Sequence, residues 1–254
     1  VMTWAPQLEA VARIASSEER IAQYTRLLEH ALHDTPSASL PSLVRTYVDG
    51  AVLDPVNTTG AGLLVGRHML AHLATQLAAA HIPANILCTI VSDTLATCEA
   101  SSIMGDDELG PWRVLLAEQY ASLSRWRDAA QALQSITPHA ARRIPQLSFA
   151  QLCVRVVELW LHDLPSHVAE AEQAIKRANS AILDERDNKA LVHELWSYHA
   201  RVLAIQHRFM EAAARYMDLP HADMYAAVYA IISPPSAQRT SMLTRLAQRA
   251  SAWP

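Results

Sequence analysis

Apolar residues recur with a helical period along most of this chain. Between residues 63 and 80, Leu70, Leu73 and Leu77 follow one another at intervals of three and four, which places them on one face of a helix. Further segments show the same period, and short stretches rich in Pro, Ser, Asp or Asn separate them. The pattern predicts helices at about 17–33, 42–52, 63–80, 83–100, 112–123, 126–136, 147–161, 166–183, 188–206, 209–217, 224–232 and 237–251.

Glycine is scarce, which agrees with a helical chain. The sequence has six glycines, and all of them lie between Gly50 and Gly110. Ala, Leu, Arg and Glu are abundant, and these residues cost little free energy in a helix. We therefore predict an all-α fold.

Three of the predicted helices begin with similar sequences. The segments that start at Trp126, Val168 and Phe209 align with one another, and their starts are 42 and 41 residues apart. A fixed period in this range is typical of stacked helix pairs, in which each pair buries its apolar face against its neighbours. The predicted architecture is a tetratricopeptide-like, right-handed helical solenoid with a looser repeat than the 34 residues of tetratricopeptide units.

Small residues occupy the same place in each repeat. Ala129, Ala171 and Ala212 align, and a small side chain lets two helices approach closely. We expect these alanines to form the contact between paired helices, and Trp126, Phe209 and Tyr216 to fill the gap to the next pair.

The chain divides into an irregular part and a regular part. We expect residues 1–104 to form irregular helical repeats and residues 105–254 to form regular helix pairs. The stretch 101–111, which contains Gly105 and Gly110, is the expected flexible joint between them.

Composition narrows the classes of function. The chain has 254 residues, of which 51% are hydrophobic and 18% charged, so it can bury a sizeable core. A net charge of −4 argues against a nucleic-acid binder.

No apolar run reaches the roughly 18 residues that a membrane-spanning helix needs. The first residues lack a basic region followed by an apolar one, so we expect no signal peptide. Cys88, Cys98 and Cys153 form no Cys-x-x-Cys motif, which predicts a reducing compartment and three buried thiols.

Two segments imitate known motifs but lack an essential feature of each. A zinc-protease helix needs two histidines four residues apart, whereas His193 and His199 are six apart and position 197 is serine. The glycines between Gly60 and Gly66 resemble a dinucleotide-binding loop, but no β-strand is predicted before them. A glycine-containing loop that enters a helix is the simpler interpretation.

Two pairs of histidines have a spacing that could hold a metal. His68 and His72 are four residues apart, and His162 and His167 could face each other across a turn. The sequence places no third ligand beside either pair, and it contains no nucleophile motif. We therefore assign no catalytic, cofactor-binding or metal-binding residue and expect no cofactor.

Short charged clusters occur at the predicted turns. Asp106-Asp107-Glu108 is too short for a calcium-binding loop, and we interpret it as a solvated cluster at a helix N-terminus. Arg125, Arg127 and the pair Arg142-Arg143 could meet an acidic partner, but solvated turns explain them more simply.

The order and spacing of these segments resemble one known family. Gln7-Leu-Glu-Ala, Tyr24 to Leu32 and Trp126 to Leu133 are similar to its first helices and its repeat helices. His199 to Tyr216 is the closest match, and Gln238 to Leu246 resembles the stretch that leads to a winged helix. On these residues the chain resembles subunit four of the COP-nine signalosome, the complex that removes a ubiquitin-like modifier from cullins.

This resemblance carries expectations that composition does not. Family members are non-catalytic scaffold subunits with an N-terminal helical-repeat arm and a C-terminal PCI domain that ends in a winged helix. The resemblance implies that the arm senses the cullin–RING ligase substrate, while a metalloprotease on another chain performs the reaction. The present sequence stops before any winged-helix strands, so residues 105–254 would lead into a PCI domain whose winged helix is absent.

The expected partners and compartments follow from the same resemblance. The expected partners are other signalosome subunits, of the PCI and metalloprotease types, and the cullin–RING ligase. We expect no binding to nucleic acid or to a membrane. The expected compartments are the cytoplasm and the nucleus. Partner-binding residues cannot be named from one sequence. The alternatives are the corresponding proteasome-lid subunit, a tetratricopeptide-like peptide-binding adaptor, and an α-helical enzyme with a histidine-built metal site.

Overall fold

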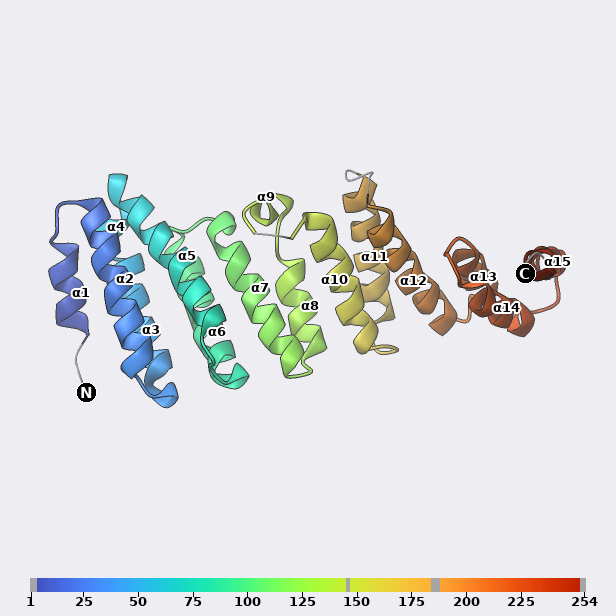
Figure 1. Ribbon diagram of the computed structural model, residues 1–254, viewed down its shortest axis with the longest axis horizontal. Helices are drawn as coiled ribbons and strands as arrows, with labels where there is room; N and C mark the ends of the chain where they lie inside the picture. The colour runs from blue at the N-terminus through green and yellow to red at the C-terminus, as the bar shows by residue number, and fades with distance from the viewer. Residues whose placement is uncertain (1–3, 145–146, 184–187, 252–254) are drawn as a thin grey trace. The chain divides into compact units, whose positions relative to one another are not determined.

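The computed structural model describes residues 4–144, 147–183 and 188–251, and these residues form fifteen α-helices and no β-strand (Figure 1). The chain separates into two compact units, Val1–Ser148 and Phe149–Pro254. The predicted all-α, helical-repeat class is confirmed.

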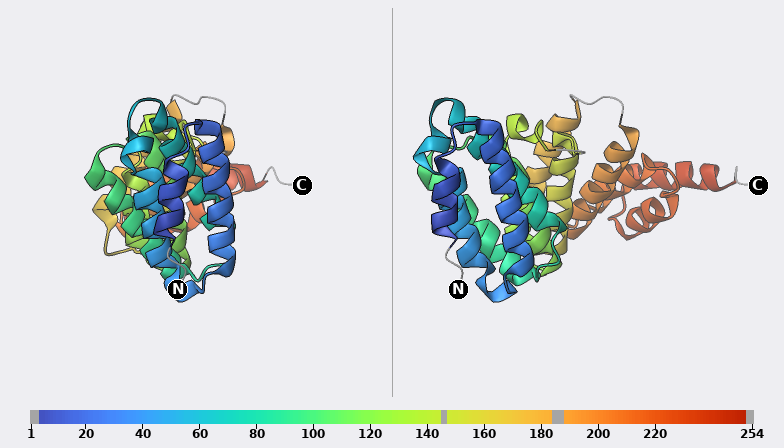
Figure 2. Two further views of the ribbon diagram at one scale, coloured as in Figure 1. Left: turned by 90° about the vertical axis from the view of Figure 1, so that its left-hand side faces the viewer. Right: turned by 60° about the vertical axis from the view of Figure 1, so that its left-hand side comes forward.

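The first unit contains nine helices within its described residues, together with short 3-10 turns at Ser37–Ser39 and Gly60–Gly62 and a π-helical turn at Val48–Val52. Helix α2 packs on α5, α3 packs on α6, and both α5 and α6 pack on α7. Helices α1 and α2 lie side by side at its N-terminal end (Figures 1 and 2). The helices are α1 (Ala5–Ala12), α2 (Ser17–Asp34), α3 (Leu40–Tyr47), α4 (Pro55–Thr58), α5 (Leu63–Ala79), α6 (Ala84–Ser101), α7 (Asp106–Ser122), α8 (Trp126–Gln134) and α9 (Pro138–Ala141).

The described part of the second unit is a series of six helices in which each packs on the next. Helix α12 also packs on α10, so three consecutive helices share one core. The helices are α10 (Phe149–His162), α11 (Val168–Leu183), α12 (Lys189–Ile205), α13 (Phe209–Met217), α14 (Asp223–Ile232) and α15 (Ala237–Ser251).

The predicted repeat is visible in the helix starts. Helices α8, α11 and α13 begin at Trp126, Val168 and Phe209, and each packs on the helix before it. The aligned alanines, Ala129, Ala171 and Ala212, are each 0% exposed. Because an alanine side chain ends at Cβ, these positions allow close contact between paired helices, as the sequence predicted.

The turn before each of these helices repeats as well. The residue that precedes the helix is basic and pairs with an acidic residue three positions later: Arg125 with Asp128, His167 with Glu170, and Arg208 with Glu211. In the first and third turns a left-handed residue, Ser124 or His207, ends the preceding helix. This recurring contact was not identified from the sequence.

The expected joint at 101–111 is helical over its second half. Helix α7 starts at Asp106, six residues before the predicted start, and contains Pro111. Proline costs about 3 kcal/mol inside a helix, but acidic residues in the first turn and the burial of Leu109 and Trp112 offset this cost. Arg113 also pairs with Glu99 and Asp106 across the turn.

Helices α6 and α7 pack together within the first unit, and the division of the chain into two compact units falls at 148/149. The predicted division at 104/105 separates irregular repeats from regular ones, and it stays a prediction. Other differences lie at the helix ends. The helix predicted at 42–52 begins at Leu40 and ends in a π-helical turn, and the short helices α1, α4 and α9 were not among the predicted ranges.

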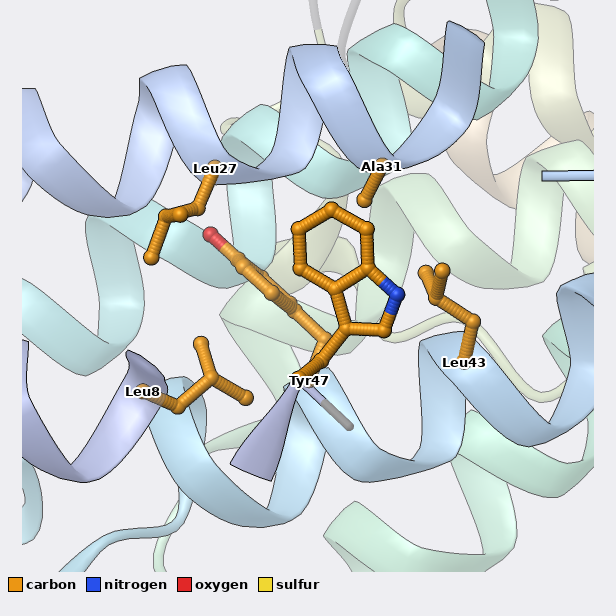
Figure 3. A pocket seen from close by; sticks show the side chains of 6 residues that line it. Leu8, Leu27, Ala31, Leu43 and Tyr47 are labelled. Carbon is orange, nitrogen blue, oxygen red and sulfur yellow. The ribbon is translucent and has the colours of Figure 1, made fainter. Parts of the chain in front are cut away.

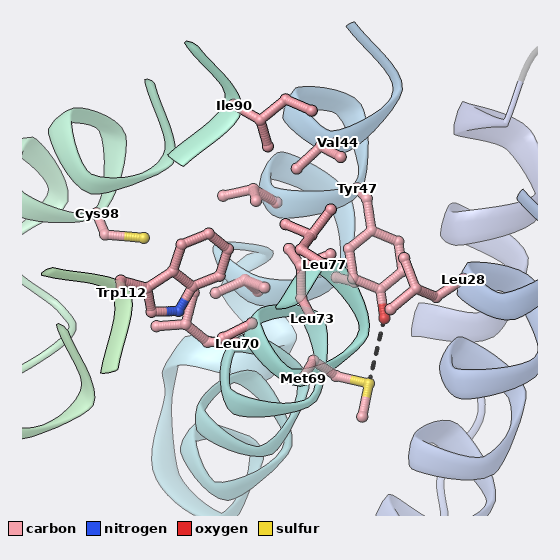
Figure 4. Packing of buried hydrophobic residues seen from close by; sticks show 14 of the residues in the cluster. Leu28, Val44, Tyr47, Met69, Leu70, Leu73, Leu77, Ile90, Cys98 and Trp112 are labelled. Carbon is pink, nitrogen blue, oxygen red and sulfur yellow. Dashed lines mark hydrogen bonds between the residues drawn. The ribbon is translucent and has the colours of Figure 1, made fainter. Parts of the chain in front are cut away.

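Large apolar side chains fill the first unit. Figure 4 shows Leu70, Leu73 and Leu77 from α5 between Tyr47 and Trp112, and all five side chains are at most 3% exposed. The cysteines Cys88, Cys98 and Cys153 are all buried, as predicted. Burial raises the pKa of the Cys98 thiol to about 11, so it is protonated at neutral pH.

A buried polar network fixes the turn between α3 and α5. Arg20 of α2 is 5% exposed, and its Nη1 donates to Oδ1 of Asn57 at 2.9 Å. The amide nitrogen of Asn57 donates to the carbonyl of Ala51 at 3.0 Å and to the hydroxyl of Tyr24 at 3.2 Å. Asn57 thus provides a hydrogen-bond partner both to the buried Arg20 guanidinium and to the buried carbonyl of Ala51.

Replacing Asn57 with leucine is expected to destabilise the first unit by about 3 kcal/mol. Leucine has nearly the same size, but it leaves Nη1 of Arg20 and the carbonyl of Ala51 without the hydrogen bonds that Asn57 gives them, at about 1–3 kcal/mol for each neutral group and more for a charged one. Chemical denaturation measures the loss. The exposed Asn85→Leu is the control and should change the free energy of unfolding by about 0.5 kcal/mol or less. Equal effects of the two variants would contradict the role of the network.

Replacing Ala212 with leucine is expected to cost about 1–3 kcal/mol, because three additional carbon atoms do not fit between paired helices. The matched control is Ala247→Leu, since Ala247 is exposed on α15. Thermal unfolding of both variants tests the contact. An Ala212→Leu protein as stable as the parent would show that the helices are not closely packed at this position.

Candidate interaction surface

Helix α14 is attached to the second unit by stacked aromatic rings. The rings of Tyr216 and Tyr229 lie 5.5 Å apart and are parallel within 1°. Phe209 stacks on Tyr229 at 6.2 Å, and Tyr225 stacks on Tyr216 at 5.4 Å. Offset stacked pairs contribute about 0.5–1.5 kcal/mol each beyond their buried area. The stack joins α13 to α14, and it confirms that Phe209 and Tyr216 fill the space next to the following helix.

The opposite side of α14 is apolar and exposed. Ala226 and Ala230 are fully buried, whereas five large apolar side chains are at least half exposed. Of the ten exposed large hydrophobic residues in the part of the chain that the structure describes, these five lie on this helix. We call them the Met224 face: Met224, Tyr225, Val228, Ile231 and Ile232.

The spacing of the Met224 face is that of one helix stripe. Its members fall at positions i, i+1, i+4, i+7 and i+8, which lie within about a third of the helix circumference. Isolated exposed apolar residues are ordinary, but a contiguous patch typically marks an interaction surface. The Met224 face therefore has the character of a protein-binding surface.

Helix α15, which packs on α14, carries positive charge. Its sequence contains Arg239, Arg245 and Arg249 and no acidic residue. Arg249 donates to the carbonyl of Met217 at 3.2 Å and pairs with Asp223 at 3.0 Å. Among the residues that the structure places, Arg239 and Arg245 have no carboxylate partner.

A shallow open groove runs along one side of α15, starting at the turn that follows α14. Arg239 and Leu243 are partly buried in it, so a guanidinium and an apolar side chain share the same depression. The groove is lined by Pro235, Ser236, Arg239, Thr240, Leu243 and Thr244.

A second charged group lies where α11, α12 and α13 meet. Arg208 pairs with Glu211 and lies 3.7 Å from Glu172, and His199 of α12 is partly buried beside them. Burial, together with the charges of Arg215 and Arg208, lowers the pKa of His199 from its ordinary value of about 6.5. His199 is therefore neutral at pH 7.

An apolar pocket in the first unit is too small for an organic ligand. It lies among α1, α2 and α3, and its free volume of about 10 Å³ is about what one water molecule needs. Figure 3 shows Leu27 and Ala31 of α2 facing Leu43 and Tyr47 of α3 across it. The pocket is a small gap in the packing of the core, and we assign no binding or catalytic role to it.

The structure does not assemble the histidine pairs into metal sites. His167 is paired with Asp163 and Glu170, at 3.1 and 3.5 Å. On α5, His68 is exposed while His72 is partly buried. Within the described residues no three His, Cys, Asp or Glu side chains converge on a point where a metal ion could bind.

The acidic cluster at the start of α7 is less solvated than expected. The Glu108 side chain is only 8% exposed and lies within 3.1–3.3 Å of Arg67 and Arg143, and Asp107 pairs with His139 and Arg143. Helix α9 packs on α7, and this packing brings Arg143 close to Asp107 and Glu108. Arg143 is thus paired with carboxylates of its own unit. Arg125 is likewise occupied, since it pairs with Asp128 and lies over the ring of Tyr120 at 4.4 Å.

The Met224 face was missed by the sequence reasoning. The signal was nevertheless present, because the segment from Met224 to Ile232 is apolar on all sides of the predicted helix. A helix that is apolar all round is typically buried on both sides. Only the structure shows that one side is covered and the other is exposed.

Lowering the pH from about 7 to 5 is expected to destabilise the second unit through His199. Its pKa is lower in the folded than in the unfolded state, so the unfolded state binds more protons in this range and the free energy of unfolding falls. His199→Gln removes the titrating group and should reduce this pH dependence. Denaturation of the parent and the variant at several pH values measures the difference. Parallel stability–pH curves for the parent and His199→Gln would contradict it.

Comparison with known proteins agrees with these observations. No family model matches the chain. It is 29% identical over 258 residues to the COP9 signalosome complex subunit 4 of Caenorhabditis elegans, an alignment that covers 93% of this chain and 61% of the relative. The proteins of the same name from Arabidopsis thaliana and Drosophila melanogaster are each 25% identical over 210 residues. These alignments cover 82% and 80% of this chain and 49% and 48% of the relatives.

The chain spans about half to three fifths of the length of the curated relatives it matches. No helix in the described ranges combines the length and apolar character that crossing a membrane requires. The resemblance drawn from the residues is confirmed: over most of its length the chain is similar to subunit 4 of the COP9 signalosome.

Proposed function

We propose that this chain is the helical-repeat part of a COP9 signalosome subunit 4 and serves as a non-catalytic scaffold. The observation that carries the proposal is the similarity to the Caenorhabditis elegans subunit over 93% of the chain. The helical-repeat fold supports it, because stacked helix pairs present long surfaces to other proteins. In this assignment residues 105–254 lead towards a PCI domain, and residues 1–104 form the outer part of the arm.

The proposed partners are the other signalosome subunits and the cullin–RING ligase from which the complex removes a ubiquitin-like modifier. The reaction itself would take place on a metalloprotease chain, and this chain would contribute binding energy and position. An exposed apolar helix face such as the Met224 face is the kind of surface that a scaffold offers. The proposed compartments are the cytoplasm and the nucleus.

Co-expression with the remaining signalosome subunits tests the assignment. The tagged chain is expected to recover sibling subunits and cullins, and deneddylation by the reconstituted complex should fall at least tenfold when the chain is omitted. The chain alone should have no deneddylase activity. Recovery of proteasome-lid subunits or of a single short peptide would favour the lid or adaptor alternative. Stoichiometric zinc or iron in the purified chain would contradict a non-catalytic scaffold.

A further inference from the structure

We draw no further inference here: the strongest candidate, the exposed apolar Met224 face of α14, carries none, because nothing in the structure shows what covers it.

Discussion

The contact between paired helices at alanine positions is the interaction on which the rest of this structure depends. Ala129, Ala171 and Ala212 are completely buried, and each lies in the first turns of a helix that packs on its predecessor. A larger side chain would separate the two backbones and leave the aromatic and aliphatic residues around the contact without close neighbours. Because each pair is packed largely by elements adjacent in sequence, the same solution can be repeated along the chain.

Local contacts between a basic and an acidic side chain fix how each repeat begins. The basic residue before the helix and the acidic residue three positions later meet at Arg125, His167 and Arg208, although the surrounding sequences differ. Such exposed pairs contribute little free energy individually. Their effect is geometric, because they hold the first turn of the second helix while the short connection reverses the chain. In the first unit the buried Arg20–Asn57 contact has a stronger structural role, since it fixes a turn that no regular helix pair supports.

The same packing leaves one side of α14 exposed within the described residues. Helix α14 buries small residues against α13 and α15 and presents large apolar residues on its other side. Stacked rings stabilise the helix without covering that side. This arrangement accords with similarity to a subunit of a multiprotein complex.

The sequence alone determined the helical class, the helix starts at Trp126 and Phe209, and the burial of the aligned alanines, because helical periodicity and side-chain size are local properties. It did not determine that α7 begins at Asp106, because the burial of Leu109 and Trp112 outweighs the local effect of Pro111. Nor could it show which side of α14 is covered. Apolar residues surround that helix, and only the packing of α13 and α15 decides which of them remain exposed.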